Sequence, residues 1–153
     1  GQCAARCRRC LMRALLDVNV LIAILDSAHI AHVTAITWLR ANAAKGWASC
    51  PITQNGCLRI MSAPRYPAAM PVREVATRLR EATARVEHEF WPDSVSLLNE
   101  LAIDTSRVLG PGQLTDIYLL ALAVSRDGYF VTLDESVTIS AVRGAQPSHL
   151  LVL

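Results

Sequence analysis

The sequence predicts an α/β fold, a three-layer sandwich with a mostly parallel central sheet, and two observations favour it. Short apolar runs alternate with longer segments of helical periodicity along the chain. The short runs are apolar throughout, which is typical of strands that are buried on both faces of a parallel sheet. Because crossover helices return the chain between such strands, we expect all strands to end at one edge of the sheet, where ligands of these folds bind.

The chain has 153 residues, of which 52% are hydrophobic and 18% charged, as expected for one domain with a large core. We expect residues 12–153 to form that domain. Residues 1–11 have no apolar pattern, and we interpret them as a leader, either an expression remnant or the product of an upstream start. No apolar run is long enough to cross a membrane, so we expect a soluble, cytoplasmic protein.

The net charge of +2 is not evidence for nucleic-acid binding, because it comes from the leader. Removing Arg6, Arg8 and Arg9 from the 15 basic residues leaves 12 against 13 acidic ones, a net charge of −1. The apparent basicity of the chain therefore belongs to the leader and not to the expected domain.

The five cysteines suggest no shared function. Cys3, Cys7 and Cys10 have the spacing of a metal clip, but no matching second pair of ligands follows. An odd count argues against a secreted disulfide framework. Cys50 and Cys57 lie in no Cys/His/Asn arrangement that would activate a nucleophile.

Elements of the first half follow from apolar runs and from the residues that stop or cap them. Asp17 ends the first strand, Gly46 terminates a helix, and Thr53 is placed to cap the next helix. The predicted order is a strand over 14–16, helices over 18–25 and 31–44, a strand over 47–52 and a helix over 53–62.

The clearest element of the second half is the apolar helix over 115–126, TDIYLLALAVSR. Thr115 is placed to cap it, Asp116 lies in its first turn, and Gly128 follows its end. The other predicted elements are a proline-containing loop over 63–71, an amphipathic helix over 72–86, a strand over 87–91, a helix over 95–101, a turn at 110–112, and strands over 129–133 and 150–153.

Several carboxylates follow predicted strands. Asp17 lies in ALLDVNVLIAIL, where eight of twelve residues are Leu, Val or Ile, and a buried carboxylate is costly unless it is paired or bound to metal. Asp134 and Asp93 follow two other strands, and Asp116 opens a helix. Clustered carboxylates repel one another, and a divalent cation removes that repulsion. Since oxygen ligands suit Mg²⁺ or Mn²⁺, we expect Asp17, Asp116 and Asp134 to hold a metal, with Asp93 a weaker candidate.

Each carboxylate also has a simpler interpretation. Asp17 could only cap the following helix, and Asp116 could only be stabilised by a helix dipole. Asp134 and Asp93 could be turn residues. The combination favours a metal site, because Asp17 and Asp134 follow strands independently of each other.

Four blocks occur in a specific order, with FWPD between the second and third: ALLDVNVLIAIL, PITQNGCLRI, GPGQLTDIYLLALA and FVTLDES. Over residues 12–153 this order resembles PIN-domain ribonucleases, and more narrowly the VapC toxins of bacterial type II toxin–antitoxin modules. The resemblance implies a PIN-like parallel sandwich, Mg²⁺ or Mn²⁺ at the three aspartates, and hydrolytic cleavage of RNA. It also implies that Asn19 and Thr115 orient the site, and that Arg59 matches a frequent arginine.

The second block departs from the family pattern. Gln54 and Asn55 stand where many members carry a glutamate near the start of the helix. An amide can bind a hard cation but brings no charge and is a poor general base. This leaves an alternative, a catalytically weak or inactive PIN-fold module that binds RNA or an antitoxin. The family implies a cognate antitoxin, and the high apolar content favours a homodimer.

Two other site types fit the residues less well. A strand-ending aspartate is also typical of haloacid dehalogenase-type phosphatases and of receiver domains, but both need a lysine in the site. Lys45, the only lysine, lies in a loop-like stretch before the second strand. His29 and His32 have the i, i+3 spacing of zinc ligands, yet no third ligand is near, so we expect a structural or surface role.

Overall fold

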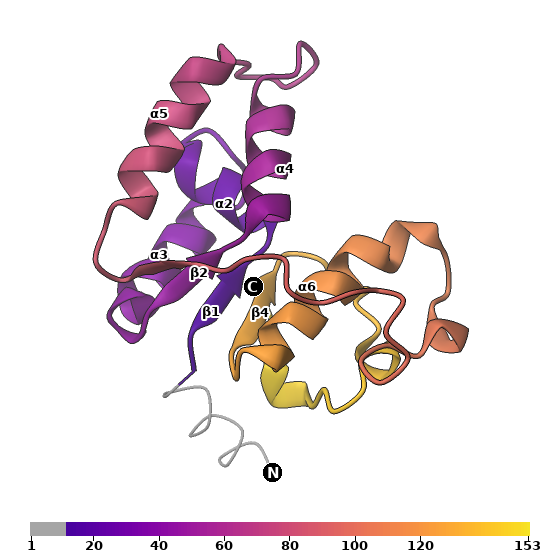
Figure 1. The fold of residues 1–153 in the computed structure, drawn as a ribbon. Coiled ribbons are helices and arrows are strands. Elements are labelled where there is room, and N and C mark those ends of the chain that lie inside the picture. Colours follow the sequence, from indigo (N-terminus) through magenta and orange to yellow (C-terminus); the bar gives the residue numbers. More distant parts are fainter. Residues whose placement is uncertain (1–11) are drawn as a thin grey trace.

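A computed structural model of the chain describes residues 12–153, and the expected leader lies outside the described residues. The central sheet has five strands in the order β3-β2-β1-β4-β5, and every registered pair is parallel (Figure 1). This confirms the predicted α/β class and the parallel sheet. The strands are β1 (Ala14–Leu16), β2 (Trp47–Ser49), β3 (His88–Phe90), β4 (Tyr129–Thr132) and β5 (Leu150–Val152).

Helices cover both faces of the sheet, which gives the three layers seen in Figure 1. Successive residues of a strand point to opposite faces, so Leu15 and Phe130 pack with one helical layer while Leu16 and Val131 pack with the other. No helix within residues 12–153 is long and apolar enough to cross a membrane. One layer holds α2 (Val18–Leu25), α3 (His32–Asn42), α4 (Pro51–Met61) and α5 (Val72–Thr83), and the other is built on α6 (Leu114–Ser125).

The junction of β2 and α4 differs from the prediction. The strand ends at Ser49, because Cys50 is the extended N-cap of α4 and Pro51 is its first residue, a position where proline loses no hydrogen bond. Thr53 is therefore not the N-cap. It lies in the first turn, where its hydroxyl accepts a hydrogen bond of 2.9 Å from the backbone N–H of Cys50.

The helix predicted over 95–101 is wrong. The side chains of Ser96 and Asn99 accept hydrogen bonds from the backbone N–H groups of Leu98 and Leu101, at 3.1 and 3.0 Å. Such local bonds offer the backbone an alternative to helical ones, and the segment forms turns instead.

The start of α6 also differs from the prediction. A short 3-10 turn over Pro111–Gln113 precedes it, and the helix begins at Leu114. Thr115 is then an exposed residue of the first turn rather than the N-cap. The first strand and α2 have the predicted bounds. The remaining predicted helices and strands are present with bounds that differ by up to a few residues; α5, for example, ends at Thr83.

The order of the strands creates a switch point at the centre of the sheet. The chain runs from β1 to β2 and β3 on one side, and then crosses to β4 and β5 on the other. The segments that follow β1 and β4 therefore diverge, and ligands of open α/β sheets bind in the crevice that this divergence leaves. Asp17 follows β1 directly, and Asp134 lies two residues beyond β4.

Candidate active site

Asp17 is buried at the switch point, with only 5% of its surface exposed. It is the N-cap of α2, and its Oδ1 accepts a hydrogen bond of 2.7 Å from the backbone N–H of Val18. Its Oδ2 accepts a second bond of 2.7 Å from the hydroxyl of Thr132. Burial raises the pKa of Asp17, while these two bonds oppose that rise. The capping role and a place in the site are thus compatible.

Thr132, the last residue of β4, connects the polar groups around Asp17. Besides donating to Asp17, its hydroxyl oxygen lies 3.0 Å from the backbone N–H of Asp134 and 3.4 Å from Nδ2 of Asn19. Oδ1 of Asn19 in turn accepts from the backbone N–H of Leu133 at 3.3 Å. Thr132 was not among the predicted site residues, although it is the single threonine in the apolar strand YFVTL.

Asp116 and Asp134 form a hydrogen-bonded pair of carboxyl groups. Oδ1 of Asp134 accepts from the backbone N–H and the hydroxyl of Ser136, at 2.8 and 2.6 Å, and these bonds lower the pKa of Asp134. Burial, followed by the negative charges of Asp17 and Asp134, raises the pKa of Asp116 to about 7. The pair therefore shares a proton at mildly acidic pH.

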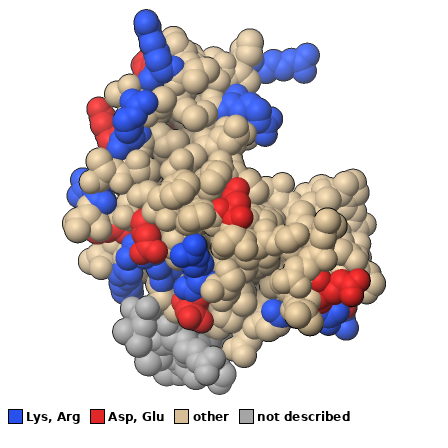
Figure 2. Space-filling view, viewed as in Figure 1, with Lys and Arg blue, Asp and Glu red and all other residues tan. Residues whose placement is uncertain are grey.

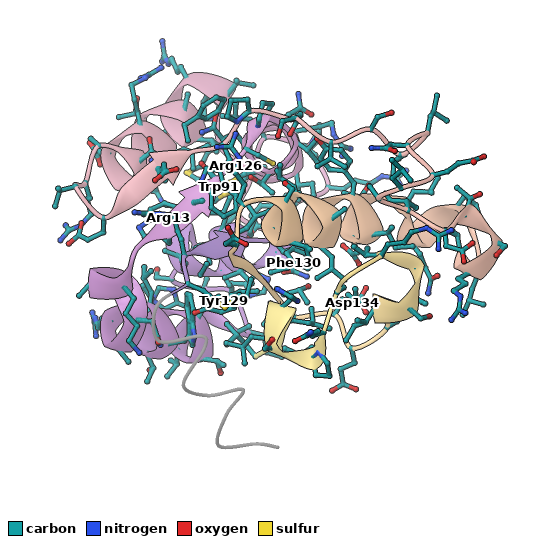
Figure 3. The ribbon with its side chains drawn as sticks, turned by 60° about the horizontal axis from the view of Figure 1, so that its bottom comes forward. Arg13, Trp91, Arg126, Tyr129, Phe130 and Asp134 are labelled. Atoms are coloured by element: carbon teal, nitrogen blue, oxygen red, sulfur yellow. The ribbon has the colours of Figure 1, made fainter. Side chains whose placement is uncertain are left out.

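The three carboxylates open into one pocket of about 380 Å³. Its wall also includes Tyr66 and Ile60, neither of which the sequence analysis singled out. Figure 3 labels Tyr129 and Phe130, the first two residues of β4, and Asp134, which follows the other end of this strand. The residues that line the pocket are Asp17, Val18, Asn19, Ile22, His29, Ile60, Tyr66, Asp116 and Asp134.

Other candidates from the sequence do not line this pocket. Asp93, Thr115, Asn55 and Arg59 are exposed and lie outside its wall. The charge of Asp93 acts on Tyr118, whose pKa is raised first by burial and then by that carboxylate. The two histidines have different surroundings. His29 lines the pocket, whereas Nδ1 of His32 lies 2.7 Å from the carbonyl oxygen of Ala23.

Gln54 is turned toward β2 and β3 rather than lining the pocket. Its Nε2 donates to the hydroxyl of Ser49 at 3.0 Å, and that hydroxyl lies 2.8 Å from Nε2 of His88. The other ring nitrogen of His88 is hydrogen-bonded to the backbone of Thr83, so the neutral ring accepts from Ser49. Burial lowers the pKa of His88, which agrees with a neutral ring in this chain of bonds.

The donor set fits a hydrated hard cation better than an enclosed metal. Among residues 12–153, no group of three or more His, Cys, Asp or Glu side chains is arranged so that it could hold a metal ion by itself. Mg²⁺ keeps several waters and is usually bound through one or two carboxylates together with substrate phosphates. The paired carboxyl groups of Asp116 and Asp134, with Asp17 beside them, provide such an oxygen-only site.

Comparisons with known proteins found close relatives but no matching family model. The chain is 51% identical to Ribonuclease VapC44 of Mycobacterium tuberculosis over 142 residues, which are 93% of this chain and 100% of that protein. It is 37% identical to Ribonuclease VapC38 of the same species over 142 residues, 92% and 99% of the two chains. Ribonuclease VapC29 is 41% identical over 123 residues, 80% and 86% of the two chains.

The fold is also similar to that of a solved structure. The match is to the crystal structure of VapBC2 from Rickettsia felis bound to a DNA fragment from their promoter. The TM-score is 0.62 at 14% sequence identity, and the match covers 93% of this chain and 99% of that one. At this identity the similarity supports the fold alone.

Proposed function

Because the chain belongs to the VapC family of ribonucleases, the toxins of VapBC toxin–antitoxin modules, we propose that it is a Mg²⁺- or Mn²⁺-dependent endoribonuclease acting through Asp17, Asp116 and Asp134. The observation that carries this proposal is the meeting of these three carboxylates in one pocket at the switch point of the sheet. Burial and the negative charges of Asp17 and Asp134 raise the pKa of Asp116 to about 7, and a bound cation would offset the repulsion between the three carboxylates.

Each carboxylate has a distinct role in this proposal. Asp17 is held by Val18 and Thr132, and both bonds stabilise its charged form. Ser136 occupies Oδ1 of Asp134, so Oδ2 is the oxygen that remains to share with Asp116 or a cation. When bound, the ion would supply an activated water and stabilise charge on the scissile phosphate. One of the carboxylates accepts the proton of the attacking water.

The first test is RNA cleavage by the full chain. The protein is incubated with a pool of structured RNAs in Mg²⁺ or Mn²⁺, with and without EDTA. We expect cleavage that needs the metal and is lost in Asp116→Asn. Asp127→Asn is the matched control, since this aspartate lies outside the pocket and has a φ of 52°, a conformation that asparagine tolerates.

A second candidate function is binding without cleavage, and the position of Gln54 favours it. Neither this amide nor Asn55 lines the pocket, so α4 contributes no polar ligand there. The discriminating measurement is the melting temperature. A bound ion stabilises the folded state by mass action. A metal-dependent shift without cleavage would point to an untested RNA target, whereas the absence of both would favour the binding module.

We also propose an antitoxin partner, a homodimer and a cytoplasmic location. Exposed leucines lie on the irregular segment 91–113, among them Leu98, Leu101 and Leu109, with 89%, 86% and 83% of their surfaces exposed. Apolar surface of this kind is typical of a protein interface. Light scattering of the purified protein, alone and with its antitoxin, tests both assemblies.

Arginines on α4, α5 and their connection are the proposed contacts for RNA phosphates. Figure 2 shows Lys and Arg side chains around the part of the surface that these helices form. Arg59, Arg65 and Arg73 are exposed there, and Arg78 donates to the carbonyl of Leu25, the last residue of α2, at 3.3 Å. Arginine forms planar paired bonds with phosphate oxygens, which position a backbone without reading its sequence.

A further inference from the structure

The pocket has two chemically different ends, and α2 runs between them. Asp17 is the N-cap of this helix and Asp26 is its C-cap. Its eight residues span about 12 Å at 1.5 Å per residue. Val18 and Ile22, one turn apart on the same face, line the pocket between the two ends. The pocket therefore extends beyond the carboxylates by more than the site of one phosphate requires.

Tyr66 and His29 form the far end of the pocket, and local hydrogen bonds hold both. The hydroxyl of Tyr66 donates to Oδ2 of Asp26. The backbone N–H of His29 donates to the carbonyl of Asp26 at 3.1 Å, and its Nδ1 accepts from the backbone N–H of Ala31 at 3.0 Å. Since Nδ1 is an acceptor, the neutral ring carries its proton on Nε2. The far end thus presents a tyrosine ring and an imidazole with a donor.

Close packing of α4 on α2 completes the apolar wall. A Cβ placed at Gly56 would lie 2.6 Å from Cγ2 of Val18, so only glycine lets the two helices approach this closely. Ile60 lies one turn farther along α4 and lines the pocket. The far end is accordingly bounded by two flat rings and by aliphatic side chains from two helices.

We propose that this far end, defined by His29, Ile60 and Tyr66, is a subsite for the unpaired nucleobase next to the scissile phosphate. The proposal rests on the proposed function, because it takes the three carboxylates as the site of the phosphate. Within residues 12–153 no Lys or Arg lines the pocket, so the far end suits a neutral group rather than a second phosphate. Unpaired bases are neutral and planar, and proteins bind them by stacking on Tyr and His and by hydrogen bonds to their edges. The volume of about 380 Å³ lies in the range of small-ligand pockets.

The test pairs a base deletion with a side-chain deletion. After the cleavage site is mapped, two oligoribonucleotides are compared, one intact and one with an abasic ribose beside the scissile phosphate. Stacking of one base on an aromatic ring contributes about 1–3 kcal/mol, which corresponds to roughly 5- to 160-fold in kcat/KM. We expect such a loss for the abasic substrate with the unchanged protein and for Tyr66→Leu with the intact substrate. Combining the two changes should cost no more than either alone.

Two further variants separate stacking from folding. Tyr66→Phe keeps the ring and loses only the bond to Asp26, so it should cleave the intact substrate far better than Tyr66→Leu. Phe90→Leu removes an aromatic side chain that is 50% exposed on β3, outside the pocket, and should leave kcat/KM unchanged. If the two losses in kcat/KM multiply when Tyr66→Leu is assayed with the abasic substrate, the proposed subsite is overturned.

A binding measurement keeps the subsite testable if the protein cleaves nothing. Adenosine, guanosine, cytidine and uridine carry no phosphate, so they need no metal to approach the carboxylates. Saturation-transfer NMR with the full chain should detect at least one of them, with the signal lost in Tyr66→Leu and kept in Tyr66→Phe. Cleavage failure with nucleoside binding would reject the proposed function but not the subsite. Unchanged nucleoside binding and cleavage in Tyr66→Leu, with weaker inhibition by the antitoxin, would assign the pocket to a protein side chain and overturn the proposal.

Discussion

The hydroxyl of Thr132 donates to Oδ2 of Asp17 over 2.7 Å and so joins two residues that are 115 positions apart in the chain. Both residues are buried. Asp17 follows β1 and Thr132 is the last residue of β4, the neighbour of β1 in the sheet. The same hydroxyl accepts from the backbone N–H of Asp134 at 3.0 Å. One side chain that is not itself a carboxylate therefore sets the positions of two of the three carboxylates.

Thr132→Val should destabilise the protein and impair the site together. Valine keeps the shape of threonine but leaves a buried carboxylate oxygen and a backbone N–H without their partner, at a cost of about 1–3 kcal/mol. Urea unfolding at neutral pH measures this change in the free energy of unfolding. Thr132→Ser retains the hydroxyl and should recover most of it. A loss in Thr132→Ser together with unchanged stability in Thr132→Val would show that packing of the methyl group, and not the hydrogen bond, is responsible.

The pKa of Asp116, raised to about 7, predicts a pH dependence of stability in the absence of metal. The folded protein binds a proton that the unfolded chain releases near its ordinary value of 3.8. The stabilisation is therefore complete below about pH 4 and is lost as the pH rises through about 7. Thermal melts in EDTA should show this loss, and it should be smaller in Asp116→Asn, where the raised pKa of Asp17 still contributes a loss of the same sign. The lowered pKa of Asp134 acts in the opposite direction and only at lower pH.

The stabilisation by bound metal should increase with pH, opposite to the stabilisation by the proton on Asp116. A cation competes with the proton shared by Asp116 and Asp134, so the rise in melting temperature on adding Mg²⁺ should grow between pH 6 and 8. Melts at fixed Mg²⁺ concentration across this range provide the measurement. A rise in melting temperature that is the same at every pH, or that persists in Asp116→Asn, would place the ion elsewhere.

Ser136→Ala should weaken metal binding without removing a ligand. The hydroxyl of Ser136 orients Oδ1 of Asp134 and helps to keep its pKa low. Loss of such a supporting bond typically costs 10- to 100-fold in metal affinity, and we expect about 10-fold because the backbone bond remains. Calorimetric titration with Mn²⁺ would measure it. Ser106→Ala is a matched control, since Ser106 holds Asp104 in the same way outside the pocket.

Gln54→Glu tests whether the amide affects the metal site. Because Gln54 donates to Ser49 and does not line the pocket, the Mg²⁺-dependent rise in melting temperature should stay unchanged. A carboxylate can only accept the Ser49 hydrogen, so His88 must then donate instead, and its pKa should rise. NMR titration of the His88 ring detects this. Asn55→Asp places the same charge on the neighbouring exposed residue, and a larger metal effect for Gln54→Glu than for this control would contradict the prediction.

Elements whose signal lies within a short stretch of residues could be predicted from the sequence. The apolar runs of β1, β4 and α2 appear within one residue of where the pattern predicts them, because burial on both faces leaves no polar alternation to misread. Where side chains compete with the backbone for hydrogen bonds, as Ser96 and Asn99 do, hydrophobic periodicity predicted a helix that does not form.

Which polar residues come together depends on the packed fold. Parallel strands bring Asp17 and Asp134 to one edge, which the pattern could predict, and the packing of α6 then decides that Asp116 joins them. Asp93 and Thr115 lie at the surface instead, and Gln54 on α4 donates to Ser49. Tyr66 lines the pocket from the loop after α4, and its hydroxyl donates there to Asp26, a residue 40 positions away. Such contacts depend on distances across the fold, and these arise only when the helices have packed on the sheet.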